Sequence, residues 1–437
     1  MSQLAAQGPH GPAHAGEARW RIEPATITAP AAWAGAVPGL LLVLGAAAII
    51  VTAIYGLTGA NLKHALAAYH VGVLYTLSLA IGSLALVMIM HQFNAGWSVT
   101  VRRLLENAAS LFPVCLVLLL PVLVIELANH GVLFERWMEP GLRDHASPLY
   151  DPLIDHKSPY LNTPFFLFRA ALYFAVWIFL SWRLLAYSRE QDRTGDRWLT
   201  ARARRLSSIG LVLLALTTAF AGYDWAMSLD PHFYSTMWGV YIFAGSALAA
   251  TALCVLTAAK LRYYGKLEGL VTDEHLHDLG KLMLAFTIFW AYISFSQYFL
   301  IWYSNIPEET SWYVLRKHHG WQNLAVALCV GHFALPFLFL LWRNSKRRIL
   351  LIGAAAAWIL FMHALDLVFI IRPEVYKPGL GQAGTPSVGF EPLLDVAGVL
   401  GPVLVFLGVY ARRLAAAPLI PVNDPRLGEA LEHRNYV

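Results

Sequence analysis

Ten stretches of about 20 apolar residues recur along this chain, and they constrain its fold more than any other feature. They lie near residues 36–56, 70–91, 109–129, 165–187, 206–226, 235–259, 281–303, 320–342, 348–371 and 390–411. Apolar residues make up 58% of the 437 and charged residues only 14%, which excludes both a soluble globular chain and a disordered one. Within hydrocarbon, a helix satisfies all of its own backbone polar groups. We therefore predict an all-α integral membrane protein with ten transmembrane helices.

The three cysteines give no sign of a disulfide framework or a metal site. Cys115, Cys254 and Cys329 each lie alone in an apolar stretch, with no second cysteine within a few residues. Zinc ribbons, iron–sulfur clusters and covalent c-type haem all need closely spaced cysteines. We therefore predict that this chain binds no metal and no covalently attached cofactor.

The positive charges are divided unevenly between the two sides of the membrane. Of the 32 lysines and arginines, 23 lie in the N-terminal arm, in every second loop or in the C-terminal tail, 8 lie in the other loops, and Arg169 lies inside a span. The richer side faces the cytoplasm, so both termini are predicted to be cytoplasmic. The first 35 residues lack the short apolar core of a signal peptide. The predicted organisation is a cytoplasmic arm over 1–35, a ten-helix membrane domain over 36–412 and a cytoplasmic tail over 413–437.

The segment 130–164 then forms a long outer loop. The outer loops are rich in prolines and in aromatic residues, namely Trp137, Tyr150, Tyr160, Trp312 and Tyr313. This composition suits ordered contacts with a large partner, and it equally suits an interfacial aromatic belt.

On the cytoplasmic side, two charged residues follow the second apolar stretch. Arg102 and Glu106 are four residues apart. We expect them to pair weakly on a short interfacial helix that lies against anionic headgroups.

Ionisable residues inside the spans of the first half gather near the outer surface. Glu126, Arg169 and Asp224 lie at similar depth in three successive spans, with Tyr223 beside Asp224. We expect these three charges to satisfy one another, and His130, four residues after Glu126, to continue the same helix face. Two interpretations remain open. The cluster is either an ion-pair staple between helices, or a quinone-binding and proton-releasing site near the outer face.

The second half carries a further set of buried ionisable residues. His363 and Asp366 are three residues apart and share one helix face, His332 lies near mid-membrane in the span before them, and the last span adds Glu391 and Asp395. A chain of exchangeable groups from mid-membrane to one face is what a proton half-channel requires. We take His332, His363, Asp366, Asp395, Glu126 and Asp224 as proton-transfer candidates. A stripe of Trp290, Ser294, Gln297 and Tyr298 in the seventh span must face protein or water, although such aromatic stripes more often serve packing.

Two longer motifs resemble a known family. The stretch 91–106 reads HQFNAGWSVTVRRLLE, and the stretch 279–309 reads LGKLMLAFTIFWAYISFSQYFLIWYSNIPEE. Both are similar to the ActF-type, NrfD-like (polysulfide-reductase-type) membrane subunits of alternative complex III, a bacterial quinol oxidoreductase. The resemblance extends from about residue 35 to the C-terminus.

The resemblance implies a fold, a location and a set of partners. The ten helices would form two four-helix bundles, helices 2–5 and 6–9, flanked by helices 1 and 10, in the bacterial inner membrane. The partners would be a sister NrfD-like ten-helix subunit, an iron–sulfur subunit with a molybdopterin-enzyme-like domain, multihaem cytochrome c subunits, small membrane anchors and a terminal oxidase. Haem c and iron–sulfur clusters would belong to those partners. Electrons would pass from menaquinol or ubiquinol to a cytochrome c or to the oxidase, so enzyme activity would belong to the assembly.

The resemblance also favours proton conduction over quinol oxidation as the role of this chain. Quinol oxidation is better placed in the sister subunit, which lies under the iron–sulfur cluster. The polar groups of this chain are then expected to conduct protons toward the outer face, with quinone contact as a second role. Two other classes of function remain: a stand-alone secondary transporter and a purely structural scaffold. A transporter favours broken helices at matching places in both halves, whereas Pro113, Pro121, Pro336 and Pro402 do not correspond between the halves.

Overall fold

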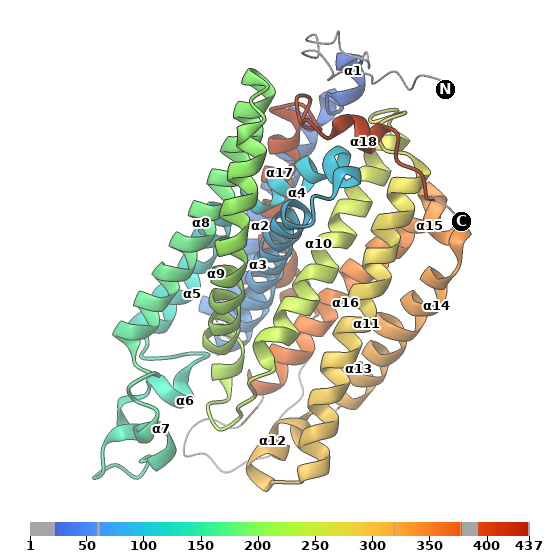
Figure 1. The fold of residues 1–437 in the computed structure, drawn as a ribbon. Helices are drawn as coiled ribbons and strands as arrows, with labels where there is room; N and C mark the ends of the chain where they lie inside the picture. The colour runs from blue at the N-terminus through green and yellow to red at the C-terminus, as the bar shows by residue number, and fades with distance from the viewer. Residues whose placement is uncertain (1–21, 59–61, 319, 376, 378–391, 436–437) are drawn as a thin grey trace, which may run out of the picture.

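The computed structural model describes residues 22–58, 62–318, 320–375, 377 and 392–435. This described part is mostly helical, with connecting turns and loops, and contains no β-strand (Figure 1). Ten of its helices are long and apolar enough to cross a membrane. The predicted class, an all-α membrane protein with ten spans, is therefore confirmed. Most of the predicted N-terminal arm, and Glu391, lie outside the described residues.

The ten spans follow one another along the chain. They are α2 (Ala36–Thr58), α3 (Leu62–Gln92), α4 with α5 (Val99–Ala109 and Phe112–Ala128), α8 (Thr163–Thr194), α9 (Trp198–Trp225), α10 (Trp238–Tyr263), α11 (Asp273–Ser304), α13 with α14 (Trp321–Ala327 and Leu335–Leu341), α16 (Ile349–Val375) and α17 (Pro392–Ala415). A π-helical turn, η5 (Leu328–Ala334), joins α13 to α14.

Several helices are longer than their apolar stretches. Helix α3 begins at Leu62 and α8 continues to Thr194, each several residues beyond the predicted stretch. The third span differs most from the predicted stretch 109–129, because it is built from two helices, α4 and α5. Every residue of α4 is buried. Pro113 lies in the first turn of α5, where a missing backbone N–H costs little.

The spans pack as two rings that share a central contact. The first ring is formed by α3, α5, α8 and α9. The second ring is formed by α10, α11, the α13–α14 segment and α16. Helix α3 contacts both α10 and α16, while α2 and α17 pack on the outer side of α3 (Figure 1). The centre of the molecule is thus the seam between α3 and α10.

Small residues allow this seam to close. A side-chain carbon at Gly82 of α3 would lie 1.9 Å from the backbone oxygen of Ser246 in α10, so only glycine permits this approach. Helices in a membrane gain their packing energy from such close contacts, since lipid offers no hydrophobic driving force.

The two ends of the helices carry different structures. At one end lie α1 (Pro24–Ile27), α15 (Arg343–Arg347) and α18 (Leu427–Leu431), and at the other lie α6 (Glu135–Met138), α7 (Pro152–His156) and α12 (Pro307–Arg316) (Figure 1). The first described residues and the tail meet at the same end, where Leu419 N–H donates to Ile27 (2.8 Å) and Leu267 N–H donates to Thr26 (2.8 Å).

A buried ionic network lies at the α18 end. Arg102 and Arg103 of α4 both pair with Glu106, at 2.9 and 3.0 Å. Arg102 also pairs with Asp424 of the tail, and Arg103 pairs with Asp192 of α8, each at 2.7 Å. The expected pair of Arg102 and Glu106 is therefore confirmed. The expected position at the lipid headgroups is wrong, because α4 is covered by protein and Arg102 binds the tail.

Candidate functional site

The predicted cluster lies at the α6–α7 end of the first ring and contains an ion pair whose hydrogen bonds are made within the protein. Arg169 of α8 donates two parallel hydrogen bonds of 2.8 Å to Asp224 of α9. Tyr160 (3.0 Å) and Tyr173 (2.7 Å) donate to the same carboxylate. Burial raises the pKa of Tyr160, and the charge of Asp224 adds to the rise, so its phenol stays protonated and donates. With four donors to Asp224, this carboxylate has its hydrogen-bonding capacity filled from within the protein.

Glu126 is not part of that cluster. Its carboxylate accepts hydrogen bonds from the backbone amides of Val132 (2.8 Å), Leu133 (2.9 Å) and Phe134 (3.2 Å). It thereby closes the turn after α5, and the expected contact with Arg169 is wrong. The physical reason is the fold of the chain just beyond α5, whose free amides bind the nearest acceptor.

His130 and Tyr223 also differ from the prediction. Helix α5 ends at Ala128, and His130 is an exposed residue in the left-handed conformation (φ +53°). His130 therefore does not continue the helix face of Glu126. The hydroxyl of Tyr223 donates to the backbone oxygen of Thr236 at 2.8 Å, which ties the end of α9 to the start of α10.

The second ring holds a different kind of carboxylate. Asp366 of α16 is buried and accepts hydrogen bonds from the hydroxyl of Tyr241 in α10 and from the indole N–H of Trp290 in α11 (3.0 Å). Within the described part of the chain, no lysine, arginine or histidine lies within ion-pair distance of Asp366. A buried carboxylate held only by neutral donors is easily protonated, because nothing nearby compensates a charge.

Two buried histidines lie beside this carboxylate. His363, one turn before Asp366, shares a hydrogen bond of 2.8 Å with the hydroxyl of Ser78 in α3. His332 stacks on Trp290 with ring centroids 4.2 Å apart, and its ring lies 6.3 Å from that of His363. Among the described residues, both nitrogens of His332 and the Nδ1 atom of His363 have no hydrogen-bond partner. In a neutral imidazole one ring nitrogen donates and the other accepts, so both histidines have a nitrogen available to a water molecule.

The position of His332 depends on the π-helical turn η5. Pro336 lies four residues after His332 and offers no backbone N–H to its carbonyl. Without this hydrogen bond the regular α-helical pattern is interrupted, and the helix is wider over the π-helical turn Leu328–Ala334. Such single π-turns are frequent at functional sites, and this one carries His332 against Trp290.

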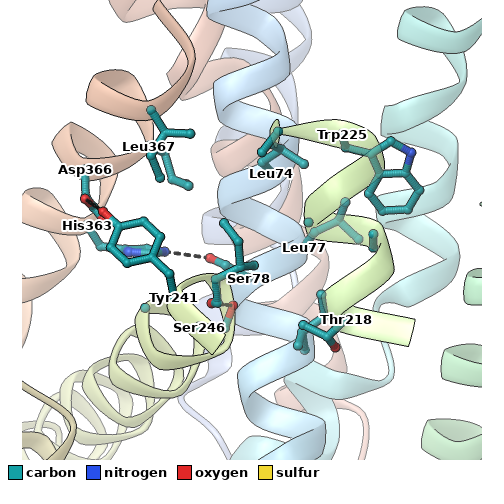
Figure 2. Close-up of a pocket in the computed structure, with 17 residues that line it drawn as sticks. Leu74, Leu77, Ser78, Thr218, Trp225, Tyr241, Ser246, His363, Asp366 and Leu367 are labelled. Carbon is teal, nitrogen blue, oxygen red and sulfur yellow. Dashed lines mark hydrogen bonds between the residues drawn. The ribbon is translucent and has the colours of Figure 1, made fainter. Parts of the chain in front are cut away.

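A small internal cavity lies beside Asp366 and His363. It has a volume of about 40 Å³ and lies between α3, α9, α10 and α16. Its walls include the polar side chains of Ser78, Thr218, Tyr241, Ser246, His363 and Asp366 (Figure 2). Figure 2 shows Asp366 beside Tyr241 and the bond between His363 and Ser78 at its edge. Its remaining walls are apolar, so water molecules would gather at the polar side chains, where there is room for about two or three of them between Asp366 and His363.

Asp395 lies outside this group. Its carboxylate pairs with Arg372 at 2.5 Å, and Arg372 also donates to the backbone oxygen of His64 at 2.9 Å. Arg372 is six residues beyond Asp366 on α16, about 9 Å along the helix. The structure thus brings together His332, His363 and Asp366, and it separates Asp395 from them.

Two further residues of the site were not predicted. Tyr241 and Ser78 lie in apolar helices without a recognisable motif. Only the packing of α10 and α3 against α16 brings their hydroxyl groups to Asp366 and His363. A tyrosine within a buried apolar helix is the signal that could have identified Tyr241, because its hydroxyl needs a partner.

A metal site is not formed in the described part of the chain. No group of three or more histidine, cysteine, aspartate or glutamate side chains there could hold a metal ion.

Comparison of the sequence with known protein families gives no match, and neither does comparison with characterised proteins.

Proposed function

We propose that this chain is an integral membrane subunit of a quinol-oxidising complex of the alternative complex III type, and that it conducts protons through its second helix ring. The proposal rests on the resemblance of the stretches 91–106 and 279–309 to that family. The packing of the spans as two rings with α2 and α17 outside agrees with the two flanked bundles that the resemblance implies.

The observation that carries the proton role is the surroundings of Asp366. It is a buried carboxylate with two neutral donors, next to two histidines that have unpartnered nitrogens among the described residues, and it borders a cavity large enough for water. Asp366 can bind and release a proton, and the histidine nitrogens and water between them would provide the hydrogen-bonded transfer steps. A proton would pass between Asp366 and His363 through the cavity, with Ser78 as the next hydrogen-bonding group.

The pair of Arg169 and Asp224 supports a different role. Because its donors and acceptors are bound within the protein, it favours a staple that fixes α8 to α9 over a quinone site. Glu126 similarly serves the turn after α5. We therefore place proton conduction in the second ring.

The distribution of charge supports an orientation. The end with α1, α15 and α18 carries the arginine-rich segments and would face the cytoplasm of a bacterial inner membrane. The end with α6, α7 and α12 would face outward, where the sister subunit, the iron–sulfur subunit and the multihaem cytochromes would dock. The haem and the clusters of such a complex would lie in those partners.

Isolation of the chain with its partners tests this function. The chain is tagged, extracted in mild detergent, and analysed by subunit masses together with a reduced-minus-oxidised optical spectrum. Co-purified c-type haem, an iron–sulfur protein and a second ten-helix chain are the expected result. A chain that isolates alone from several detergents, without haem absorbance, would discard the proposal and favour a stand-alone transporter.

A further inference from the structure

A second and larger cavity adjoins the same carboxylate. It lies between α11 and the α13–η5 segment and has a volume of about 640 Å³, which is within the range of about 300–1,000 Å³ for small-molecule sites. Aromatic rings dominate its walls, namely Tyr241, Trp290, Tyr292, Phe295, Tyr298, Tyr313, Phe333 and Phe369. Flat rings of this kind favour a planar aromatic ligand.

The mouth of this cavity opens toward lipid. Tyr292 and Phe295 of α11 are 63% and 65% exposed, and Val326 of α13 is 62% exposed. All three border the cavity and belong to membrane-spanning helices. A ligand would therefore enter from the bilayer, with an apolar tail left among the lipid chains.

The inner wall of the cavity is polar at one place. Tyr241 and Asp366 border both this cavity and the small internal cavity. The carboxylate of Asp366 accepts two hydrogen bonds from the protein and has lone pairs left for a third donor. A hydroxyl group that reached this wall from the lipid side could donate to Asp366. On the other side of the wall, Asp366 and His363 line the small internal cavity.

We propose that the cavity between α11 and η5 binds the aromatic head of a membrane-borne hydroquinone, with one of its hydroxyl groups donating to Asp366. The inference rests on the proposed function and adds a ligand site in the second ring, separate from Arg169 and Asp224. The hydrogen bond places the hydroxyl proton next to the groups that conduct protons.

The charges around the cavity favour this occupant over a phospholipid. An anionic phosphate at the inner wall would meet Asp366 and no cation. Arg316 borders the cavity but is already paired with Glu374 at 2.8 Å. Lys317 lies exposed at the rim, so a phospholipid with its phosphate there would leave acyl chains against Asp366 and give this acceptor no donor. A neutral aromatic head with hydroxyl donors fits both the aromatic walls and the acceptor.

Photolabelling of the complex tests the site. The complex isolated through this chain, or the chain itself, is illuminated with an azido-quinone analogue carrying a ten-carbon tail, and the labelled peptides are mapped. Label within 288–298 and 322–333 is expected, and an excess of the unlabelled reduced analogue should remove it. Label on other peptides, or label that phosphatidylglycerol removes as well as the reduced analogue does, would overturn the proposal.

A matched pair of substitutions sharpens the test. Ala325→Trp fills the cavity, whereas Ala327→Trp, two residues away on α13, adds the same ring at an exposed position that does not line it. Labelling should fall by about tenfold in A325W, corresponding to about 1.4 kcal/mol, and change little in A327W. Equal labelling of both variants would contradict the site. The competition on the unsubstituted protein decides the question if A325W does not fold.

The two proposals can fail separately. Labelling does not depend on turnover, so specific label on a chain without redox partners would refute the function and retain the site. A complex that oxidises quinol but takes no label in this cavity would retain the function and refute the site.

Discussion

Two buried carboxylates, Asp224 and Asp366, lie in the two rings with opposite surroundings. Asp224 receives a bidentate arginine and two tyrosine hydroxyls, so its charge is compensated. Asp366 receives only a tyrosine and a tryptophan, so its charge is not. The first arrangement fixes a structure, and the second leaves a proton equilibrium that small changes nearby can shift.

The first prediction concerns Arg169. Arg169→Leu leaves Asp224 buried without a cation, which should lower the free energy of unfolding by about 3–5 kcal/mol. Denaturation of the detergent-solubilised chain measures this loss. The double variant Arg169→Leu/Asp224→Leu should recover much of the stability, because it removes both charges. A single variant as stable as the unsubstituted chain would show that the pair does not hold α8 to α9.

At the scale of elements, close helix contacts give the second prediction. Gly82→Ala places a carbon against the backbone of Ser246 and should cost at least about 1–3 kcal/mol by overpacking. Gly353→Ala in α16 meets only Ala259 at 3.6 Å and should be neutral or slightly stabilising. The yield of monodisperse chain after detergent extraction measures both. Equal yields would mean that α3 and α10 can separate without penalty.

The tail is the second element with a specific test. Burial alone would raise the pKa of Asp424, but the guanidinium of Arg102, together with the charge and backbone amide of Arg426, outweighs burial and holds the pKa below its ordinary value. The pair therefore stabilises the tail above the unfolded pKa of about 3.9 and loses this contribution as the pH falls through the lower native pKa.

Hydrogen exchange of residues 418–435 measures this effect. Asp424→Asn should increase exchange at pH 7, and the unsubstituted chain should reach the same state only in acid, after correction for the intrinsic rates. Protection that is unchanged in D424N would show that the other contacts of the tail suffice.

At the scale of the whole molecule, the sequence predicted the class of fold and part of the site. Ten long apolar stretches indicate ten spans whatever the details of packing. The spacing of His363 and Asp366 predicted one shared helix face, and in the structure both line one cavity, which the sequence did not predict. The length of an apolar stretch reflects the thickness of the hydrocarbon layer, and a helix can continue beyond that layer. The predicted stretches are therefore shorter than α3 and α8. The burial of α4 and the capping role of Glu126 depend on neighbouring segments and on a turn, which periodicity does not encode.

The proton role of Asp366 is the central claim, and proton release by the reconstituted complex tests it most directly. Protons released per electron are measured during quinol oxidation for the unsubstituted complex, Asp366→Asn and Asp366→Glu. The account predicts that Asp366→Asn assembles with all its partners but loses the protons beyond those of quinol chemistry, and that Asp366→Glu retains them in part. An unchanged ratio in a fully assembled Asp366→Asn complex would contradict the account.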